Sequence, residues 1–129
     1  PPMTKHEALR VVRQAKSSHI RWRAYVQAML AGMDIEAAQA PLHHKECAFG
    51  QWFYREGFTA FGHWPLFHDV EYAHELLHAV YQLLHDALQE GDDTRARRIG
   101  EQLVAISYSL VDAIDLLKEE ISSCEQETF

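Results

Sequence analysis

Residues 72–80 of the chain read Tyr72-Ala73-His74-Glu75-Leu76-Leu77-His78-Ala79-Val80, with two histidines four positions apart. In a helix, residues at i and i+4 share one face, about 5–6 Å apart at Cβ. Because imidazole is the commonest side-chain metal ligand, this spacing predicts a helix that presents His74 and His78 to one metal ion. The same letters spell H-E-x-x-H, the signature of zinc peptidases, so the rest of the chain must decide what such a metal does.

A long helix is predicted around this stretch, from Pro65 to about Glu90. Pro65 stands where the first helical residue belongs, and Gly91 marks the end. His74 and His78 lie on the same side of this helix as its apolar residues. The apolar positions that recur at helical spacing are Phe67, Val70, Ala73, Leu77, Tyr81, Leu84 and Leu88.

Two further long helices are predicted at the ends of the chain. Thr4-Lys5-His6-Glu7 reads as a capping box and starts a helix that reaches about Leu30. Asp92 or Asp93 caps the last helix, which continues to about Glu120 or beyond. The first and last helices leave enough apolar surface for a partner chain. The apolar stripe of the last helix consists of Ile99, Leu103, Ile106, Leu110, Ile114, Leu117 and Ile121.

The middle of the chain is predicted to hold one short helix. Residues 31–42 form a connection with some helical character, residues 43–56 form the short helix, and residues 58–64 form a loop. Gly50 costs a helix interior about 1 kcal/mol relative to alanine, which indicates close backbone approach there. Since no segment has a strand pattern, we expect an all-α, four-helix-type bundle of three long helices and one short helix that carries Cys47.

Composition narrows the function classes. The 129 residues suit a single domain over residues 1–129, and the net charge of −7 disfavours nucleic acid or an anionic membrane as partner. No apolar run is long enough to span a bilayer. The two cysteines, Cys47 and Cys124, fit reduced thiols in the cytoplasm. Nine histidines are unusual for this length, and five of them fall between His63 and His85.

Two catalytic or redox alternatives compete with a simpler metal site. The extended zinc-peptidase signature needs glycine and histidine where this chain has Tyr81 and Leu84. Carboxylate-bridged di-iron proteins use Glu-x-x-His, which occurs here at 71–74 and 75–78, but both copies lie on one helix and cannot face each other across a core. The hemerythrin arrangement also lacks support, because the last helix contains no histidine. Both readings stay open as alternatives to a zinc site.

The remaining donor set joins three segments of the chain. His19 falls inside the apolar stripe of the first helix, where a polar ring needs a partner, and taken alone it suits a core histidine bonded to a backbone carbonyl better than a metal ligand. Together with Cys47, His74 and His78 it supplies three imidazoles and one thiolate, a set that suits tetrahedral Zn²⁺. Four protein ligands leave no position for a reactive water, so we expect a structural or sensory zinc and no enzyme activity.

The central motif resembles a known family. Cys47-Ala48-Phe49-Gly50-Gln51-Trp52-Phe53, with His44 three residues before it, is similar to the C-x-[LF]-G-x-W motif of the bacterial chemoreceptor zinc-binding (CZB) domain. The family pattern is a lone histidine on the first helix, then this motif, then a His-x-x-x-His pair. His19, Cys47, His74 and His78 follow that order, and the resemblance extends from about Ala8 to Ile121.

The resemblance implies further properties. CZB domains are four-helix-type bundles that form homodimers and bind zinc through three histidines and one cysteine. They regulate an attached or partner signalling output, such as a chemoreceptor signalling rod or a diguanylate cyclase. Some respond to zinc and others to oxidants such as hypochlorous acid, which for this chain implies oxidation of Cys47. We expect a homodimer through the first and last helices, His44 beside the metal or at the surface, and Cys124 as a free thiol.

Overall fold

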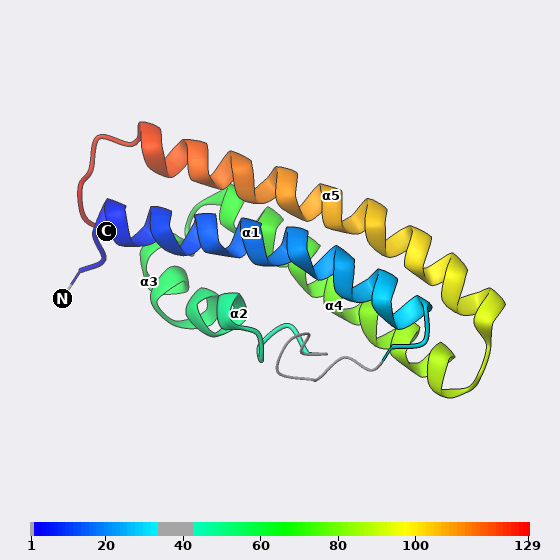
Figure 1. Ribbon diagram of the computed structural model, residues 1–129. Coiled ribbons are helices and arrows are strands. Elements are labelled where there is room, and N and C mark those ends of the chain that lie inside the picture. The colour runs from blue at the N-terminus through cyan, green and yellow to red at the C-terminus, as the bar shows by residue number, and fades with distance from the viewer. Residues whose placement is uncertain (1, 34–42) are drawn as a thin grey trace.

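The computed structural model describes residues 2–33 and 43–129, which fold into an elongated helical bundle. Three long helices form its body: α1 (Lys5–Leu30), α4 (Pro65–Gln89) and α5 (Asp93–Ser123). Helices α1 and α4 run in the same direction, and α5 runs in the opposite direction alongside both (Figure 1). The fourth position is filled over part of its length by a short segment of α2 (Ala48–Trp52), η1 (Phe53–Gly57) and α3 (Phe58–Phe61). The all-α bundle expected from the sequence is confirmed.

The ends of the long helices follow local sequence signals. Thr4 accepts a hydrogen bond from the Glu7 backbone N–H (3.1 Å), and its own N–H donates to the Glu7 carboxylate, which completes the predicted capping box. Pro65 occupies the first turn of α4, and Gly91 has a φ of 75°, a conformation that glycine adopts without a steric penalty. Asp92 caps α5 by accepting from the Arg95 N–H (3.1 Å).

The core is continuous along the bundle because the three long helices turn their apolar stripes toward one another. Helix α5 packs against both α1 and α4. The short segment adds aromatic rings at one end, where Phe53 stacks on Phe67 with ring centroids 3.8 Å apart. The largest fully buried apolar side chains are Phe53, Phe61, Phe67, Leu77, Leu84, Leu103, Leu110, Ile114, Leu117 and Ile121.

The short segment differs from its prediction. Residues 43–47 form a turn, so the helix predicted over 43–56 begins only at Ala48, and the predicted loop 58–64 is helical as far as Phe61. Packing explains the helical path beyond the predicted end. The segment winds as a π-helix over Phe53–Gly57, and Trp52 lies so close to Gly57 that a Cβ at this glycine would meet the Trp52 ring at 2.8 Å. Most of the connection predicted over 31–42 lies outside the described residues.

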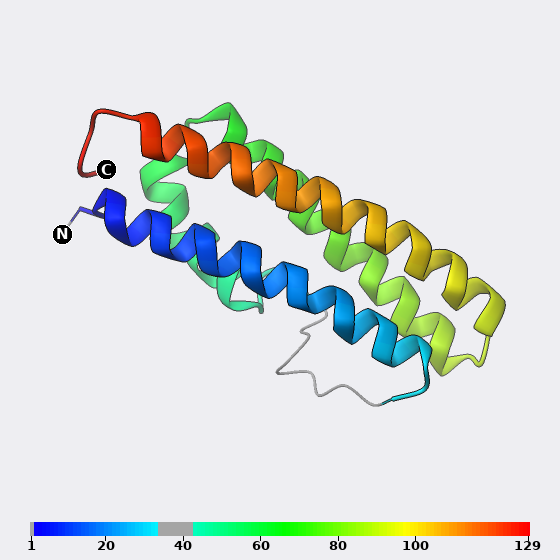
Figure 2. The same cartoon turned by 45° about the horizontal axis from the view of Figure 1, so that its top comes forward.

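The two ends of the chain pair with each other at one end of the bundle (Figure 2). The Lys5 N–H donates to the Glu127 carbonyl (2.8 Å), and the Phe129 N–H donates to the Met3 carbonyl (2.8 Å). The Phe129 ring lies 4.9 Å from that of Phe61, between ring centroids. Cys124 is a free thiol, as expected from the sequence.

Candidate metal centre

His19 reaches the centre from α1, and its tautomer is set by the helix itself. One ring nitrogen, Nδ1, lies 2.7 Å from the Ala15 carbonyl oxygen. Because a carbonyl only accepts, Nδ1 must carry the proton, and this leaves Nε2 with a lone pair for a metal. The buried histidine is therefore bonded to a carbonyl and still able to act as a ligand. Its ring is 5.8 Å from that of Phe49, between centroids.

Cys47 reaches the centre from the N-cap of α2. Its extended backbone (φ −71°, ψ 156°) turns the side chain back over the helix start, where Sγ accepts from the Gly50 N–H at 3.3 Å. A Cβ at Gly50 would lie 1.8 Å from the His44 carbonyl oxygen. Gly50 is therefore needed so that the turn at 43–46 can close over α2 and place Cys47 at its end, which confirms the close backbone approach expected there.

His74 and His78 reach the centre from consecutive turns of α4. Their ring centroids are 4.7 Å apart, and the His74 ring lies 5.2 Å from that of His19. The distance from His74 Nε2 to Cys47 Sγ is 3.2 Å. His74 is 1 % exposed, His78 4 % and His19 5 %, whereas Cys47 is half-buried. The three imidazoles thus form the floor of the centre and the thiol lies at its outer side.

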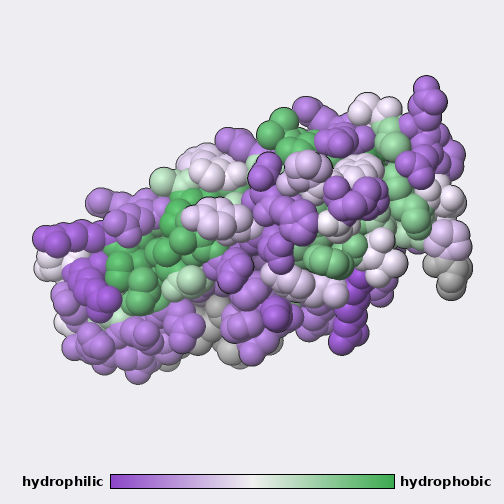
Figure 3. All heavy atoms as spheres, turned by 180° about the vertical axis from the view of Figure 1, so that it is seen from behind, coloured by the Kyte–Doolittle hydropathy of each residue, from purple (hydrophilic) through white to green (hydrophobic). Residues whose placement is uncertain are grey.

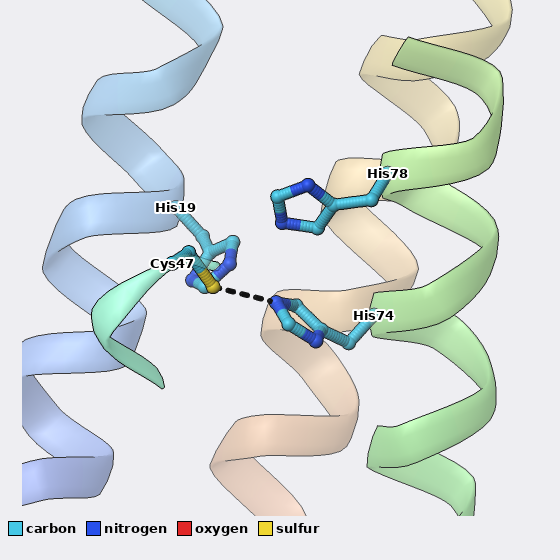
Figure 4. Close-up of side chains that lie close together, drawn as sticks. All are labelled: His19, Cys47, His74 and His78. Atoms are coloured by element: carbon cyan, nitrogen blue, oxygen red, sulfur yellow. Dashed lines mark hydrogen bonds between the residues drawn. The ribbon is translucent and has the colours of Figure 1, made fainter. Parts of the chain in front are cut away.

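The four donors converge on one point (Figure 4). One ligand atom from each of His19, Cys47, His74 and His78 lies within 4.8 Å of all the others. A tetrahedral zinc ion with bonds of 2.0–2.3 Å requires donor separations of about 3.3–3.7 Å. A contraction of about 1 Å therefore suits the centre to Zn²⁺, and the donor set of three imidazoles and one thiolate suits it chemically.

Burial sets the protonation of the donors. Desolvation lowers the pKa of His19 and lowers that of His74 well below its usual value, with the neighbouring His19 and His78 adding to the effect on His74. Neutral imidazoles are the form that binds a metal. Burial raises the pKa of the Cys47 thiol, so without a cation the thiol stays protonated. His19, His74 and Cys47 are therefore uncharged donors, and a divalent cation would convert the thiol to a thiolate.

Two side chains outside this donor set border the centre. The His44 ring is 6.2 Å from that of His74 and 5.6 Å from that of Tyr54, between centroids. Burial raises the pKa of Tyr54, and a hydrogen bond with Glu71 adds to the shift. His44 lies beside the donors as expected. The sequence analysis did not identify Tyr54, because no periodic pattern links it to Cys47 and only the turn of the short segment brings it close.

The two alternative metal sites gain no support. Among the described residues, the group of converging donors contains no carboxylate, whereas a di-iron centre is built largely from them. Glu75 of the H-E-x-x-H match is exposed and does not join that group. The geometry favours the four-ligand arrangement of a closed site over either alternative.

The helical architecture and the donor set define a zinc-binding helical module. The family described as the chemoreceptor zinc-binding domain matches this chain over residues 19–92, more than half of its length and a range that contains all four donors. The chain therefore belongs to the chemoreceptor zinc-binding domain family, as its resemblance indicated. No curated protein and no solved structure matches the chain. None of the described helices combines the length and apolarity needed to cross a membrane.

Proposed function

We propose that His19, Cys47, His74 and His78 bind one Zn²⁺ ion and that this site makes residues 1–129 a single sensory domain. The supporting observation is the approach of four donor atoms to within 4.8 Å from three separate segments, α1, the start of α2, and α4. An ion at this point would tie the short segment to two long helices. Its binding energy would then be part of the folding energy of the domain.

The proposed signal is a change at Cys47. Loss of zinc removes the tie between the short segment and the bundle. Oxidation has the same effect: a thiolate and hypochlorous acid give a sulfenic acid and chloride, and the sulfur is then a poorer ligand. Because Cys47 is the half-buried member of the set, an oxidant reaches it before the three buried imidazoles. We place the domain in the cytoplasm, where thiols remain reduced until such an oxidant appears.

The proposed consequence is control of a signalling output. Family membership points to chemoreceptor-type signalling, and a chemoreceptor or a diguanylate cyclase, attached or separate, is the output we propose. The bundle offers a mechanical connection, because the start of α1 and the end of α5 lie beside each other where residues 3–5 pair with residues 127–129. The short segment packs at the same end, so its rearrangement would be transmitted to the paired chain ends through the contact between Phe61 and Phe129.

We also propose that the domain forms a homodimer. Among the exposed large apolar residues, Tyr72, Leu76 and Leu83 follow one side of α4 and Leu116 lies on α5, whereas α1 contributes Ile20. Apolar surface gathers on the face shown in Figure 3. The exposed residues favour α4 and α5 as the contact, in place of the first and last helices expected from the sequence. Light scattering should give a dimer; a monomer at high micromolar concentration would reject this.

Metal analysis of matched cysteine variants tests the proposed site. The parent chain and Cys124→Ser should each bind about one zinc per chain, and Cys47→Ala should bind far less. X-ray absorption should show three nitrogens and one sulfur around the ion. One equivalent of hypochlorous acid should release zinc from the parent chain and from Cys124→Ser alike. Full zinc content in Cys47→Ala would contradict the ligand assignment, and zinc retained after oxidation would contradict the oxidant response.

A further inference from the structure

We propose that a small cavity beside the metal centre is an entry site, which takes up a hydrated divalent transition-metal ion and passes it to the inner donors through His78. The inference rests on the proposed function, because it takes His19, Cys47, His74 and His78 as the final ligands. It adds a second, weaker binding site and a route, neither of which the inner donor set requires.

The cavity connects the surface with one of the buried donors. Its volume is about 220 Å³, and His78 is part of its lining. Since a water molecule occupies about 30 Å³ of liquid, a space of this size holds about seven such particles, enough for an ion with six waters. The remaining lining residues are His43, His44, Glu75, Ala79 and Gln82.

The three imidazoles need such a route because they, unlike the half-buried Cys47, are difficult for a hydrated ion to reach. The three imidazoles are almost fully buried, and the Phe49 ring lies 5.2 Å from that of His74, between centroids. Apolar walls offer nothing in exchange for the waters that the ion must lose. Imidazole and carboxylate groups at the mouth of the cavity replace those waters stepwise, which lowers the barrier to entry.

The outer donors have the arrangement of a temporary site. The rings of His43 and His44 stack with centroids 4.6 Å apart, and Glu75 is exposed one turn from His78 on α4. In the part of the chain that the structure describes, none of these three joins the group of donors within 4.8 Å. Separated donors bind an ion weakly and release it readily, whereas the converging inner set retains it.

The charge around the cavity favours a cation as its occupant. Helix α4 carries four acidic residues and no lysine or arginine between Pro65 and Gln89. Among them, Glu71 and Glu75 act electrostatically on His44, against the opposite effect of His43 and Lys45. Lys45 is the neighbouring base, and its ammonium lies over the Tyr54 ring, 5.2 Å from the centroid. The Glu75 carboxylate in the lining, with Glu71 nearby, concentrates cations and accelerates their association by about tenfold, the low end of electrostatic steering.

Loading kinetics of the full chain test this route. Metal-free chain is mixed with Co²⁺, and the cobalt–thiolate absorption reports arrival at Cys47; release is followed in excess EDTA. The variant carries His43→Gln and Glu75→Gln, both at exposed positions. Its matched control carries His63→Gln and Glu101→Gln, which make the same chemical changes at exposed positions outside the cavity.

The expected result is a fall of about tenfold in both the loading and the release rate of the cavity variant at low salt, with equilibrium affinity and melting temperature unchanged. A residue on the route alters the barrier and not the end states, so both rates change by one factor. Unchanged rates would overturn the entry site alone. An altered equilibrium affinity with an unchanged loading rate would also overturn the entry site. Failure of the parent chain to bind Co²⁺ at all would overturn the proposed metal site as well.

Discussion

The α4–α5 pair and the short segment α2–η1–α3 are both helical, but different interactions hold them. Helices α4 and α5 are 25 and 31 residues long, and each buries a continuous apolar stripe against the other. The three elements of the short segment have five, five and four residues. Isolated helices shorter than about 12–15 residues are marginal in water, so the short segment depends on its contacts with the bundle.

Those contacts are of two kinds. Buried aromatic rings anchor the segment, with Phe49, Phe53 and Phe61 each contributing about 1.5–3 kcal/mol through burial. Cys47 and Gly50 then fix the start of α2 against the metal centre. Cys47, the half-buried donor, therefore belongs to the helix that depends most on its contacts with the rest of the bundle. The long pair forms a frame, and the proposed signal is a rearrangement of the short segment against it.

Removing the metal should give the largest difference in stability between the short segment and the α4–α5 pair. Structural zinc contributes about 10–16 kcal/mol of apparent binding free energy in small zinc-dependent peptides. We therefore expect EDTA to raise the rate of hydrogen exchange in residues 47–61 by several orders of magnitude. In the parts of α4 and α5 away from His74 and His78, the exchange rate should change little. Exchange measured by mass spectrometry before and after chelation checks this. Equal deprotection of both regions would show that the frame also depends on the ion.

Leu110→Ala should weaken the long pair and leave the donors in place. Leu110 is fully buried on α5, and such a truncation costs about 2.7–5 kcal/mol through lost burial and the cavity left behind. The urea midpoint should fall accordingly, while the folded variant still binds one zinc per chain. Leu116→Ala at a half-exposed position of the same helix is the control and should cost far less. Loss of zinc from folded Leu110→Ala would contradict the separation of the two regions.

Gly50→Ala should act on the short segment. The added Cβ would lie 1.8 Å from the His44 carbonyl oxygen, so the turn or α2 must shift. Such crowding costs about 1–3 kcal/mol, and we expect a fall in zinc affinity of about 5- to 150-fold, measured by chelator competition. Gly100→Ala in α5 meets only the Leu30 side chain, at 2.7 Å, which can rotate away. Equal zinc affinity in the two variants would contradict the role given to Gly50.

The smallest expected effect is the pH dependence of the metal-free chain. Burial holds the pKa of His74 well below its usual value, whereas an unfolded histidine titrates near 6.5. Below that pH the unfolded state binds a proton that the folded state refuses, so stability falls as the pH decreases. Between pH 7.5 and 6 this costs about 1 kcal/mol, which urea unfolding at several pH values measures. His74→Gln should remove this part of the slope; an unaltered slope would assign it to other groups.

Much of this organisation could be predicted from the sequence, and the exceptions share a cause. The capping box at Thr4, the proline at the start of α4 and the glycine after it are local signals, and each helix end follows them. The short helix was predicted to start at His43 but starts at Ala48, because helical spacing cannot show that Cys47 would act as an N-cap and that residues 43–47 would turn. Packing of Trp52 against Gly57 extended the helical path beyond Gly57.

By itself, the sequence determined the class of fold, the family motif and the chemical types of the donors. Helical periodicity, caps and the four-residue spacing of His74 and His78 depend on near neighbours in the chain. The sequence also predicted that His19 and Cys47 join that pair. Only the tertiary structure decided how closely the four donors approach, that Nδ1 of His19 is hydrogen-bonded to the Ala15 carbonyl, and that a cavity reaches His78. The physical reason is that these features are distances between residues far apart in sequence, and the packing of whole helices sets such distances.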